Sequence, residues 1–278
     1  MEQIISKYNT KFDNFSFHHT TTANGGKNLI EPELHSQFEI LYLLNGEIKY
    51  TIEGEEYRVS KGDVIFVQPN EIHSIEIVGK EDYERVVVMF DLDKISEILS
   101  AGDFSLDSAE FCNSKSFRVI PREILLSSNI KKIMQEIASC QEEKMLGLFV
   151  LTKILNLILE LEKIFCNKEI YVISSTDKVV EMAIKYINQN IEKKLSLEQI
   201  SKALFVSKSS LCHKFAKKMH ISINRYVAIK KIYVAGKLIK NGMGVIEASR
   251  RVGYEQYTTF YHNYKKIIGT YPSEKPNN

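Results

Sequence analysis

The sequence predicts an α+β protein of two domains, with an antiparallel β-barrel and helices in the first and an all-α second domain. Three observations support this prediction. Short apolar runs alternate with glycine turns between residues 38 and 91, helical periodicity begins near residue 127, and an internal repeat follows residue 196. The 278 residues are 44% hydrophobic and 26% charged, which suits globular domains with sizeable cores.

The composition excludes several classes of protein. The four cysteines lie far apart, at Cys112, Cys140, Cys166 and Cys212, so neither a disulfide framework nor a structural zinc site is expected. The first residues hold no apolar signal core, and charges interrupt the most apolar stretch, 145–165. We therefore expect a cytoplasmic protein without a membrane segment.

Charge divides the chain into two parts. Residues 176–278 hold 19 Lys and Arg against 7 Asp and Glu, a net charge of +12, whereas residues 1–175 carry a net charge of −10. The basic C-terminal part favours a nucleic-acid contact surface. A solvated basic face without a partner is the alternative that charge alone leaves open.

The first part alternates β-type runs with turn signals. Asn45-Gly46, Glu53-Gly54 and Lys61-Gly62 recur at a regular eight-residue step. Glycine tolerates the positive φ that tight hairpins need, so these runs predict a small antiparallel barrel.

A series of residues extends through this barrel: His35, Phe38-Glu39-Ile40, Gly46, Gly54, Gly62-Asp63 and Pro69-Asn70-Glu71-Ile72-His73. The series resembles the cupin-type sensor domain of AraC-family transcription regulators. The resemblance implies a cupin-like barrel that holds a small-molecule effector. Strand residues alternate between the lumen and the outside of a barrel. We therefore expect five residues to line the effector pocket: His35, Glu39, Leu43, His73 and Ile75.

Three interpretations of His35, Glu39 and His73 stay open. They are polar anchors for an effector, ligands of a metal-dependent cupin enzyme, or hydrogen-bonded core residues of a plugged barrel. A metal cupin has two closely spaced histidines, a glutamate and a distant histidine. Ser36-Gln37 follows His35, so one expected histidine is missing. We therefore predict no metal, no cofactor, no catalytic residue and no enzymatic activity.

Helical periodicity marks residues 127–166. Ile130, Ile133, Met134 and Ile137 share one face of a first helix. The following segment, 144–165, is apolar on two faces, and each face needs a partner. One face can cover the barrel. The other either pairs with a second copy of the chain, as the resemblance implies, or is buried within one chain.

The C-terminal part contains the same unit twice. Leu197, Ile200, Ser201, Leu204 and Val206 recur 48 residues later as Val245, Ala248, Ser249, Val252 and Tyr254. Ser209, Leu211, His213, Phe215 and Lys217 match Thr258, Phe260, His262, Tyr264 and Lys266 at an offset of 49. Such a repeat predicts two copies of one supersecondary unit.

Each copy predicts a helix-turn-helix. Ser196 and Gln199 form a capping box, Ser207 caps the second helix, and Gly253 provides a turn. The polar face of each second helix suits the major groove. The base-contact candidates are Ser209, Ser210, His213, Tyr257, Thr258, Tyr261 and His262. The phosphate-contact candidates are Lys214, Lys217, Lys218, Lys265 and Lys266. The helical segment 222–240 joins the units over about 28 Å, near the ~34 Å of one DNA turn.

The second copy carries the stretch Val245, Glu247-Ala248-Ser249, Val252-Gly253-Tyr254, Phe260, Tyr264-Lys265-Lys266 and Gly269-Thr270-Tyr271-Pro272. This stretch resembles the AraC-type DNA-binding domain, and only about residues 1–30 and 92–126 lie outside the combined resemblance. It implies a sequence-specific transcription regulator that binds double-stranded DNA as a homodimer. A sugar or metabolite would control it, and RNA polymerase is the further partner of an activator. His213 and His262 stand where family members often have arginine.

The expected domain boundaries follow from these patterns. Residues 1–126 form the sensor barrel, 127–166 a helical dimerisation segment packed on it, 167–176 a linker, and 177–278 the tandem helix-turn-helix domain. Thr176 or Asp177 is expected to cap the first helix of that domain.

Overall fold

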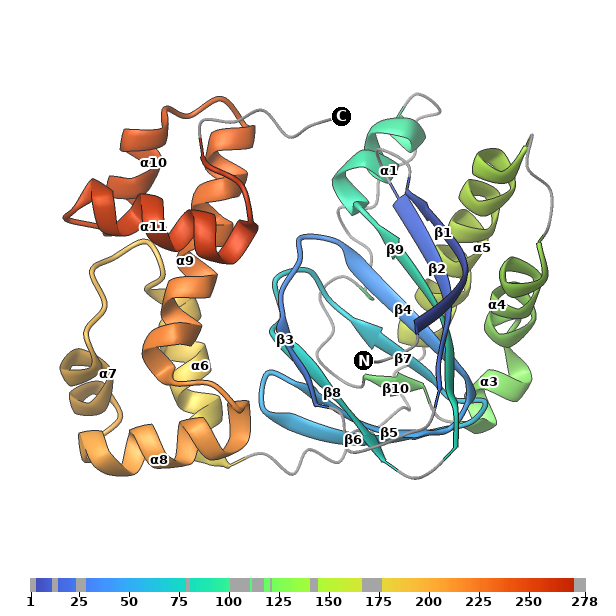
Figure 1. Cartoon of the computed structure of the whole chain (residues 1–278), viewed down its shortest axis with the longest axis horizontal. Helices are drawn as coiled ribbons and strands as arrows, with labels where there is room; N and C mark the ends of the chain where they lie inside the picture. The colour runs from blue at the N-terminus through green and yellow to red at the C-terminus, as the bar shows by residue number, and fades with distance from the viewer. Residues whose placement is uncertain are drawn as a thin grey trace. The chain divides into compact units, whose positions relative to one another are not determined.

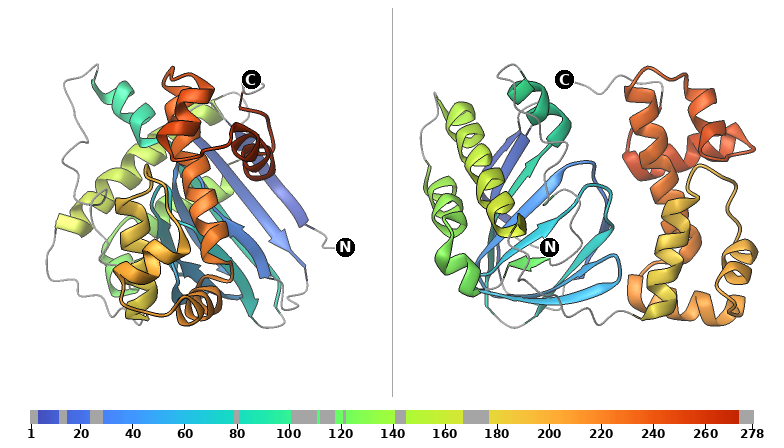
Figure 2. Two further views of the ribbon diagram at one scale, coloured as in Figure 1. Left: turned by 90° about the vertical axis from the view of Figure 1, so that its left-hand side faces the viewer. Right: turned by 180° about the vertical axis from the view of Figure 1, so that it is seen from behind.

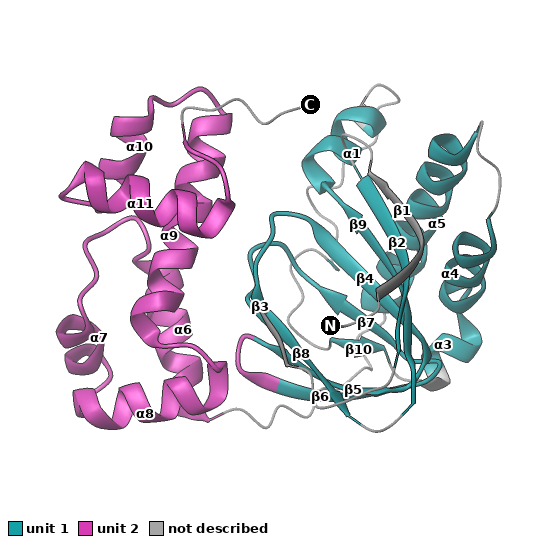
Figure 3. Ribbon diagram, viewed as in Figure 1, with its two compact units in different colours: residues 1–52, 56–174 teal, residues 53–55, 175–278 magenta. Residues whose placement is uncertain are grey.

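The computed structural model describes residues 4–11, 15–23, 29–78, 81–100, 111, 118–120, 122–140, 145–166 and 177–272. The chain divides into two compact units (Figure 3), residues 1–52 with 56–174 and residues 53–55 with 175–278. The predicted linker, 167–176, lies outside the described residues. Within the described part, no helix is both long and apolar enough to span a bilayer.

Two antiparallel sheets form the first unit (Figure 1). The larger sheet has the strand order β1-β2-β9-β4-β7-β10 and the smaller β3-β8-β5-β6. The strands are β1 (Ile4–Lys11), β2 (Phe15–Thr22), β3 (Leu29–Glu33), β4 (Phe38–Asn45), β5 (Glu47–Ile52), β6 (Glu55–Ser60), β7 (Val64–Val67), β8 (His73–Val78), β9 (Tyr83–Phe90) and β10 (Val119–Ile120). The antiparallel pairing confirms the predicted fold class. The described strands form two separate sheets, whereas the sequence predicted one barrel.

The predicted turns and strands of β4–β9 are confirmed. Gly46, Gly54 and Gly62 all adopt positive φ, at 92°, 82° and 91°. Sequence patterning missed β1, β2 and β3. The segment of β2, FSFHHTTT, shows only a weak alternation of apolar and polar residues. It forms a strand because all of its residues pair with β9, from Phe15 opposite Phe90 to Thr22 opposite Tyr83.

Helices cover the outer face of the larger sheet (Figures 1 and 2). They are α1 (Leu92–Ser100), α3 (Arg122–Ser127), α4 (Ile130–Ser139) and α5 (Leu146–Cys166). The apolar face predicted for α4 is buried: Ile130, Ile133, Met134 and Ile137. One face of α5 is buried in the same core through residues such as Ile154 and Leu161.

The second unit contains six helices among its described residues. They are α6 (Lys178–Gln189), α7 (Leu197–Ala203), α8 (Lys208–Met219), α9 (Ile223–Lys240), α10 (Val245–Arg251) and α11 (Tyr257–Ile268). The predicted caps of three of these helices are confirmed. Asp177 caps α6, Ser196 and Gln199 form the capping box of α7, and Ser207 caps α8.

The internal repeat extends to backbone conformation. Gly253, in the turn between α10 and α11, has φ of 75°, and its counterpart Phe205 has φ of 54°. Gly269 and its counterpart His220 both end their helices in the left-handed conformation. Two of these positions are not glycine, so the fold imposes the turn even where the side chain opposes it.

The turn at Gly253 generates the first prediction. A Cβ there would lie 2.8 Å from the backbone of Lys193, and φ is positive as well. Gly253→Ala should therefore lower the free energy of unfolding by about 2–4 kcal/mol, through left-handed strain plus a steric clash. Gly242→Ala is the matched control, because Gly242 has φ of 95° but no atom within 4 Å of its Cβ. It should cost about 1–2 kcal/mol. Equal losses in urea unfolding would contradict this packing.

Candidate functional site

The two second helices of the repeat expose a polar face. Leu211, Phe215, Phe260 and Tyr264 are buried as predicted. Of the base-contact candidates, Ser209, His213, Tyr257, Thr258 and His262 are exposed, whereas Ser210 and Tyr261 are half-buried. The Tyr261 ring stacks on Tyr271 at 4.8 Å between centroids. Both helices therefore present side chains that a base edge could meet.

Helix α9 holds α8 and α11 apart. The left view of Figure 2 shows both helices nearly end-on, so their axes point in similar directions. Helix α9 has 18 residues, a length of about 27 Å at its rise per residue. Two similarly oriented helices joined by a helix of this length suit successive major grooves on one face of a duplex.

The predicted phosphate-contact lysines differ in their surroundings. Lys214 forms an ion pair with Asp177 at 3.2 Å, and Lys265 lies 4.3 Å from the ring centre of Tyr271. Lys217 and Lys266 are exposed, and Lys218 is half-buried. Lys217 and Lys266 occupy equivalent positions in the two copies, so they offer the most symmetric pair of positive charges.

A buried lysine joins the two helix-turn-helix units. The Lys231 ammonium on α9 donates to the carbonyl oxygens of Lys193, at 2.7 Å, and Val252, at 2.5 Å. Burial lowers the pKa of Lys231 to about 8. Lys193 precedes the first unit and Val252 ends the first helix of the second. This single side chain therefore ties both units to the helix between them.

Other contacts reinforce this junction. Gly253 packs so closely on Lys193 that a side chain would not fit. Surface ion pairs connect Lys194 with Glu255 at 2.6 Å and Arg251 with Glu192 at 2.8 Å. The sequence analysis missed Lys231 because a lysine in an amphipathic helix usually reaches solvent. The low polarity of its neighbours Ile229, Ile232 and Tyr233 is a weak signal of its burial.

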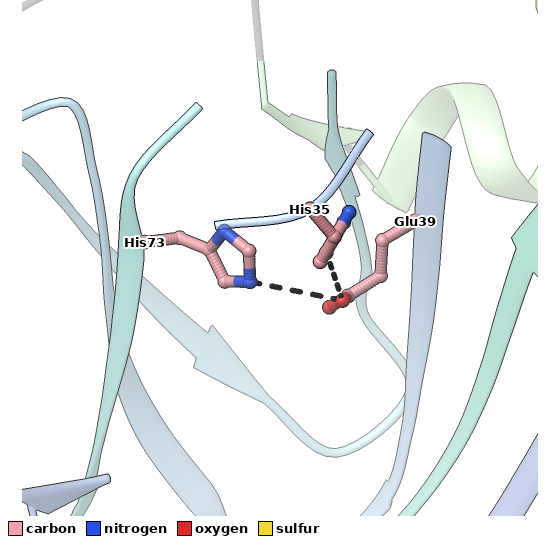
Figure 4. A group of neighbouring side chains, drawn as sticks. All are labelled: His35, Glu39 and His73. Atoms are coloured by element: carbon pink, nitrogen blue, oxygen red, sulfur yellow. Dashed lines mark hydrogen bonds and ion pairs between the residues drawn. The ribbon is translucent and has the colours of Figure 1, made fainter. Parts of the chain in front are cut away.

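The interior of the first unit has a polar group at one end. His35 Nε2 lies 3.1 Å and His73 Nε2 3.8 Å from Oε2 of Glu39 (Figure 4). Tyr50, which the sequence analysis did not single out, donates its hydroxyl hydrogen to Oε1 of Glu39 at 2.7 Å. Burial opposes ionisation, but the hydrogen bond from His35 and the charges of both histidines lower the pKa of Glu39 to about 2.

The predicted pocket residues do not form one cluster. His35, Glu39 and His73 come together, and Ile75 follows two residues along β8. Leu43 lies four residues beyond Glu39 on β4, about 13 Å away by strand rise. The apolar core between the sheets contains both Leu43 and Ile75.

A second polar group surrounds Leu43. Arg85 of β9 pairs with Leu43 on the neighbouring strand β4 and with Thr20 on the other neighbouring strand, β2. The Arg85 guanidinium stacks over the Tyr83 ring at 4.4 Å. Among the described residues, three buried atoms here have no hydrogen-bond partner: Thr20 Oγ1, Tyr83 Oη and Arg85 Nη1. Buried polar atoms without partners are costly, so this end of the interior suits a polar ligand.

Sequence reasoning missed Thr20, Tyr83 and Arg85 for two reasons. Thr20 lies on β2, which was not predicted. Arg85 and Tyr83 alternate with Val86 and Val88 on β9, and this alternation could have placed them on the inner face. No sequence signal shows that Arg85 Nη1 lacks a hydrogen-bond partner among the described residues.

A chain that combines tandem helix-turn-helix units with a double-sheet domain of polar interior has the make-up of a ligand-responsive DNA-binding regulator. Residues 22–144 match the AraC-like ligand binding domain family, and residues 200–276 match a helix-turn-helix domain family. The first match includes 92–126, which the sequence analysis left outside the resemblance. That expectation was wrong. Helices α1 and α3 have few of the residues on which the resemblance was based, but they pack in the same hydrophobic core.

The chain is similar to transcription regulators over most of its length. The chain is 26% identical to the Msm operon regulatory protein of Streptococcus mutans, over 87% of this chain and 85% of that protein. It is 21% identical to the lactose operon transcription activator of Staphylococcus xylosus, over 86% and 83%. A crystal structure of ToxT from Vibrio cholerae aligns over 94% of this chain and 97% of its own, with 14% identity and a TM-score of 0.42.

The chain therefore combines an AraC-like ligand-binding domain with a helix-turn-helix DNA-binding domain, which is the domain pair of AraC-type transcription regulators.

The Lys231 junction generates the second prediction. Lys231→Met leaves the carbonyl oxygens of Lys193 and Val252 without their donor. It therefore loosens the two helix-turn-helix units from each other. We expect at least about a tenfold loss of affinity for a full operator, because both helices no longer dock together. The salt dependence of binding should stay unchanged, since Lys231 is buried and reaches no phosphate. Lys240→Met, at an exposed position on the same helix, is the control. Unchanged operator affinity in Lys231→Met would contradict the role.

Proposed function

We propose that this regulator reads a specific operator with α8 and α11 and does so as a homodimer controlled by a small molecule. The observation that supports the DNA-reading step is the pair of exposed polar helices on a single rigid helix. The basic charge of this unit would hold the phosphates, and the polar side chains of α8 and α11 would contact base edges.

His213 and His262 hold equivalent positions in the two copies, and both are exposed. A neutral histidine offers one donor and one acceptor, whereas an arginine forms a bidentate contact with guanine. Discrimination would therefore depend more on the neighbouring hydroxyl groups of Ser209, Thr258 and Tyr257, and on thymine methyl groups.

The effector is proposed to bind at the Arg85 end of the interior. There, a buried guanidinium nitrogen and two hydroxyl groups lack partners among the described residues, whereas His35, Glu39 and His73 already contact one another. Guanidinium and hydroxyl groups together recognise a polyhydroxylated molecule that carries a carboxylate or phosphate. A sugar acid or sugar phosphate fits this chemistry. A relative named for the lactose operon, which matches most of the chain, supports a sugar-derived effector.

Dimerisation is proposed through the uncovered face of α5. Leu148 and Leu159 are 58% and 59% exposed, and Met145, just before the helix, is 55% exposed. Burial within one chain, the alternative in the sequence analysis, does not hold for these three side chains. With half-buried Leu155, they follow the three- and four-residue spacing that pairs helices in coiled coils.

The proposal includes no catalytic role, because the relatives are regulators and the polar groups serve binding. As an activator, the protein would contact RNA polymerase beside its operator. A protein that reads DNA works in the compartment that contains the DNA, which is the predicted cytoplasmic location.

The DNA-reading proposal predicts different effects for two neighbouring substitutions. His262→Ala should relax sequence preference at one half-site, with little change on random DNA. Lys266→Ala should weaken binding to every sequence alike and reduce the slope of log affinity against log salt by about 1. Gel-shift titrations on cognate and random DNA measure both effects. Equal losses on both DNAs for both variants would exclude this assignment.

The effector proposal predicts a gain and a loss in one variant. Arg85→Met removes a buried guanidinium nitrogen that has no hydrogen-bond partner among the described residues, so the ligand-free protein should gain about 1 kcal/mol of stability. A sugar acid at 100 times its dissociation constant should stabilise the unmodified protein by about 2.7 kcal/mol, and this response should vanish in the variant. Thermal melting with a panel of sugars, sugar acids and sugar phosphates measures both. Arg58→Met, an exposed position on β6, is the control. A variant that keeps the full ligand response would refute the pocket.

The dimer proposal predicts that Leu159→Lys produces monomers. A charge in an apolar helix pair opposes association, while the folded monomer tolerates it because Leu159 is exposed. Leu126→Lys is the matched control, since Leu126 is 83% exposed on α3 and outside the stripe. Sedimentation equilibrium gives the mass of each. If the unmodified protein is monomeric, or if both variants stay dimeric, α5 is not the interface.

A further inference from the structure

The His35, Glu39 and His73 group connects the two sheets. Glu39 lies on β4 in the larger sheet, His73 begins β8 in the smaller sheet, and His35 lies in the segment before β4. One ligand atom from each lies within 4.8 Å of the others. The side chains of His73 and Glu39 are 4% and 9% exposed, and that of His35 is 17% exposed. The group is therefore largely shielded from water.

Backbone contacts fix which nitrogen of each histidine faces the centre. His35 Nδ1 contacts the carbonyl oxygen of Gln37 at 2.8 Å, and His73 Nδ1 contacts that of Glu71 at 2.9 Å. A carbonyl oxygen only accepts, so each Nδ1 carries a hydrogen and donates it. In the neutral ring each Nε2 then presents a lone pair. Both Nε2 atoms point at Oε2 of Glu39 (Figure 4).

Three electron-pair donors thus converge when both rings are neutral, and the 3.1 Å hydrogen bond between His35 Nε2 and Glu39 Oε2 forms only when His35 takes up a second proton. Two neutral imidazole nitrogens facing a carboxylate oxygen repel one another unless a proton or a cation lies at the centre. The same Nδ1–H to carbonyl contact is the usual device that orients a metal-binding histidine. Both histidines use it here. Tyr50 occupies Oε1 of Glu39 and leaves Oε2 for the centre.

The spacing of the three atoms suits a small metal ion. Ligands at about 2.0–2.2 Å from a tetrahedral ion lie about 3.4 Å from each other. The observed separations from Oε2 of Glu39 are 3.1 Å to His35 and 3.8 Å to His73. Small side-chain movements would equalise them. Two imidazoles and one carboxylate form a ligand set that selects first-row transition metals over Mg²⁺ or Ca²⁺.

We propose that His35, Glu39 and His73 bind one divalent first-row transition-metal ion, such as Zn²⁺, between the two sheets of the ligand-binding domain. The missing fourth protein ligand, which argued against a metal in the sequence analysis, leaves coordination positions for water. No reaction is assigned to the ion. It would join the two sheets at one end of the interior. This end lies about 13 Å along β4 from Leu43, the residue that pairs with Arg85 of β9. The proposal goes beyond the effector function and does not depend on it.

The test uses the full chain, stripped with EDTA and titrated with CoCl₂ while visible absorption is recorded. Co²⁺ replaces Zn²⁺ at such sites and reports its ligands spectroscopically. We expect one equivalent to bind with d–d bands of a low-coordinate site. Glu39→Gln and His73→Gln should each weaken binding by at least about 100-fold, and Tyr50→Phe by about tenfold. Zn²⁺ should displace the Co²⁺.

A matched control is His19→Gln in the same domain. His19 pairs with Glu84 at 2.8 Å, but no second histidine completes that pair among the described residues. Its Co²⁺ affinity should equal that of the unmodified chain. If Glu39→Gln does not fold, His35→Gln, at the more exposed edge, replaces it.

Two outcomes would overturn the proposal. One is the absence of stoichiometric Co²⁺ binding, which would leave a protonated histidine–carboxylate pair as the account of this group. The other is binding that survives all three ligand substitutions. Sugar-acid melting shifts on the EDTA-stripped chain test the effector pocket separately, so either proposal can fail while the other stands.

Discussion

The DNA-binding unit depends on a fixed spacing between α8 and α11. Two short helices, each with a small polar face, read DNA well only when both dock at once, because docking as one body avoids a second entropic cost. The α9 helix sets their separation. The Lys231 ammonium, bonded to the Lys193 and Val252 carbonyls, ties the start of one unit and the turn of the other to α9. The tight contact at Gly253 permits little adjustment.

The ligand-binding domain follows a different constraint, which is the satisfaction of buried polar atoms. At one end of the interior, Glu39 is surrounded by donors and by two oriented histidines. At the other end, one guanidinium nitrogen of Arg85 and two hydroxyl groups lack hydrogen-bond partners among the described residues. The two ends are thus chemically distinct, one suited to a cation and the other to an anionic, hydroxylated molecule. An effector that strengthens DNA binding must itself be bound more tightly by the DNA complex.

Local patterns predicted much of this structure. Glycine spacing located the hairpins of β4–β9, helix caps located α6, α7 and α8, and the offsets of 48 and 49 residues located the repeat. Strand β2 and Lys231 escaped because their states are set by tertiary contacts. Strand β2 is held by β9, and Lys231 is buried by helices distant in sequence. Whether a buried group such as Arg85 has a partner is likewise a property of the assembled sheets.

The most direct test of the account varies the spacing of the DNA instead of the protein. With an operator selected from random DNA, 1–10 base pairs are inserted between the two sites contacted by one DNA-binding unit, and affinity is measured by gel shift. Because α9 is rigid and only about 27 Å long, affinity should fall at least about tenfold for every insertion, without recovery at a full helical turn. Affinity that is insensitive to spacing, or that recovers at ten base pairs, would show that α8 and α11 do not bind as one rigid body.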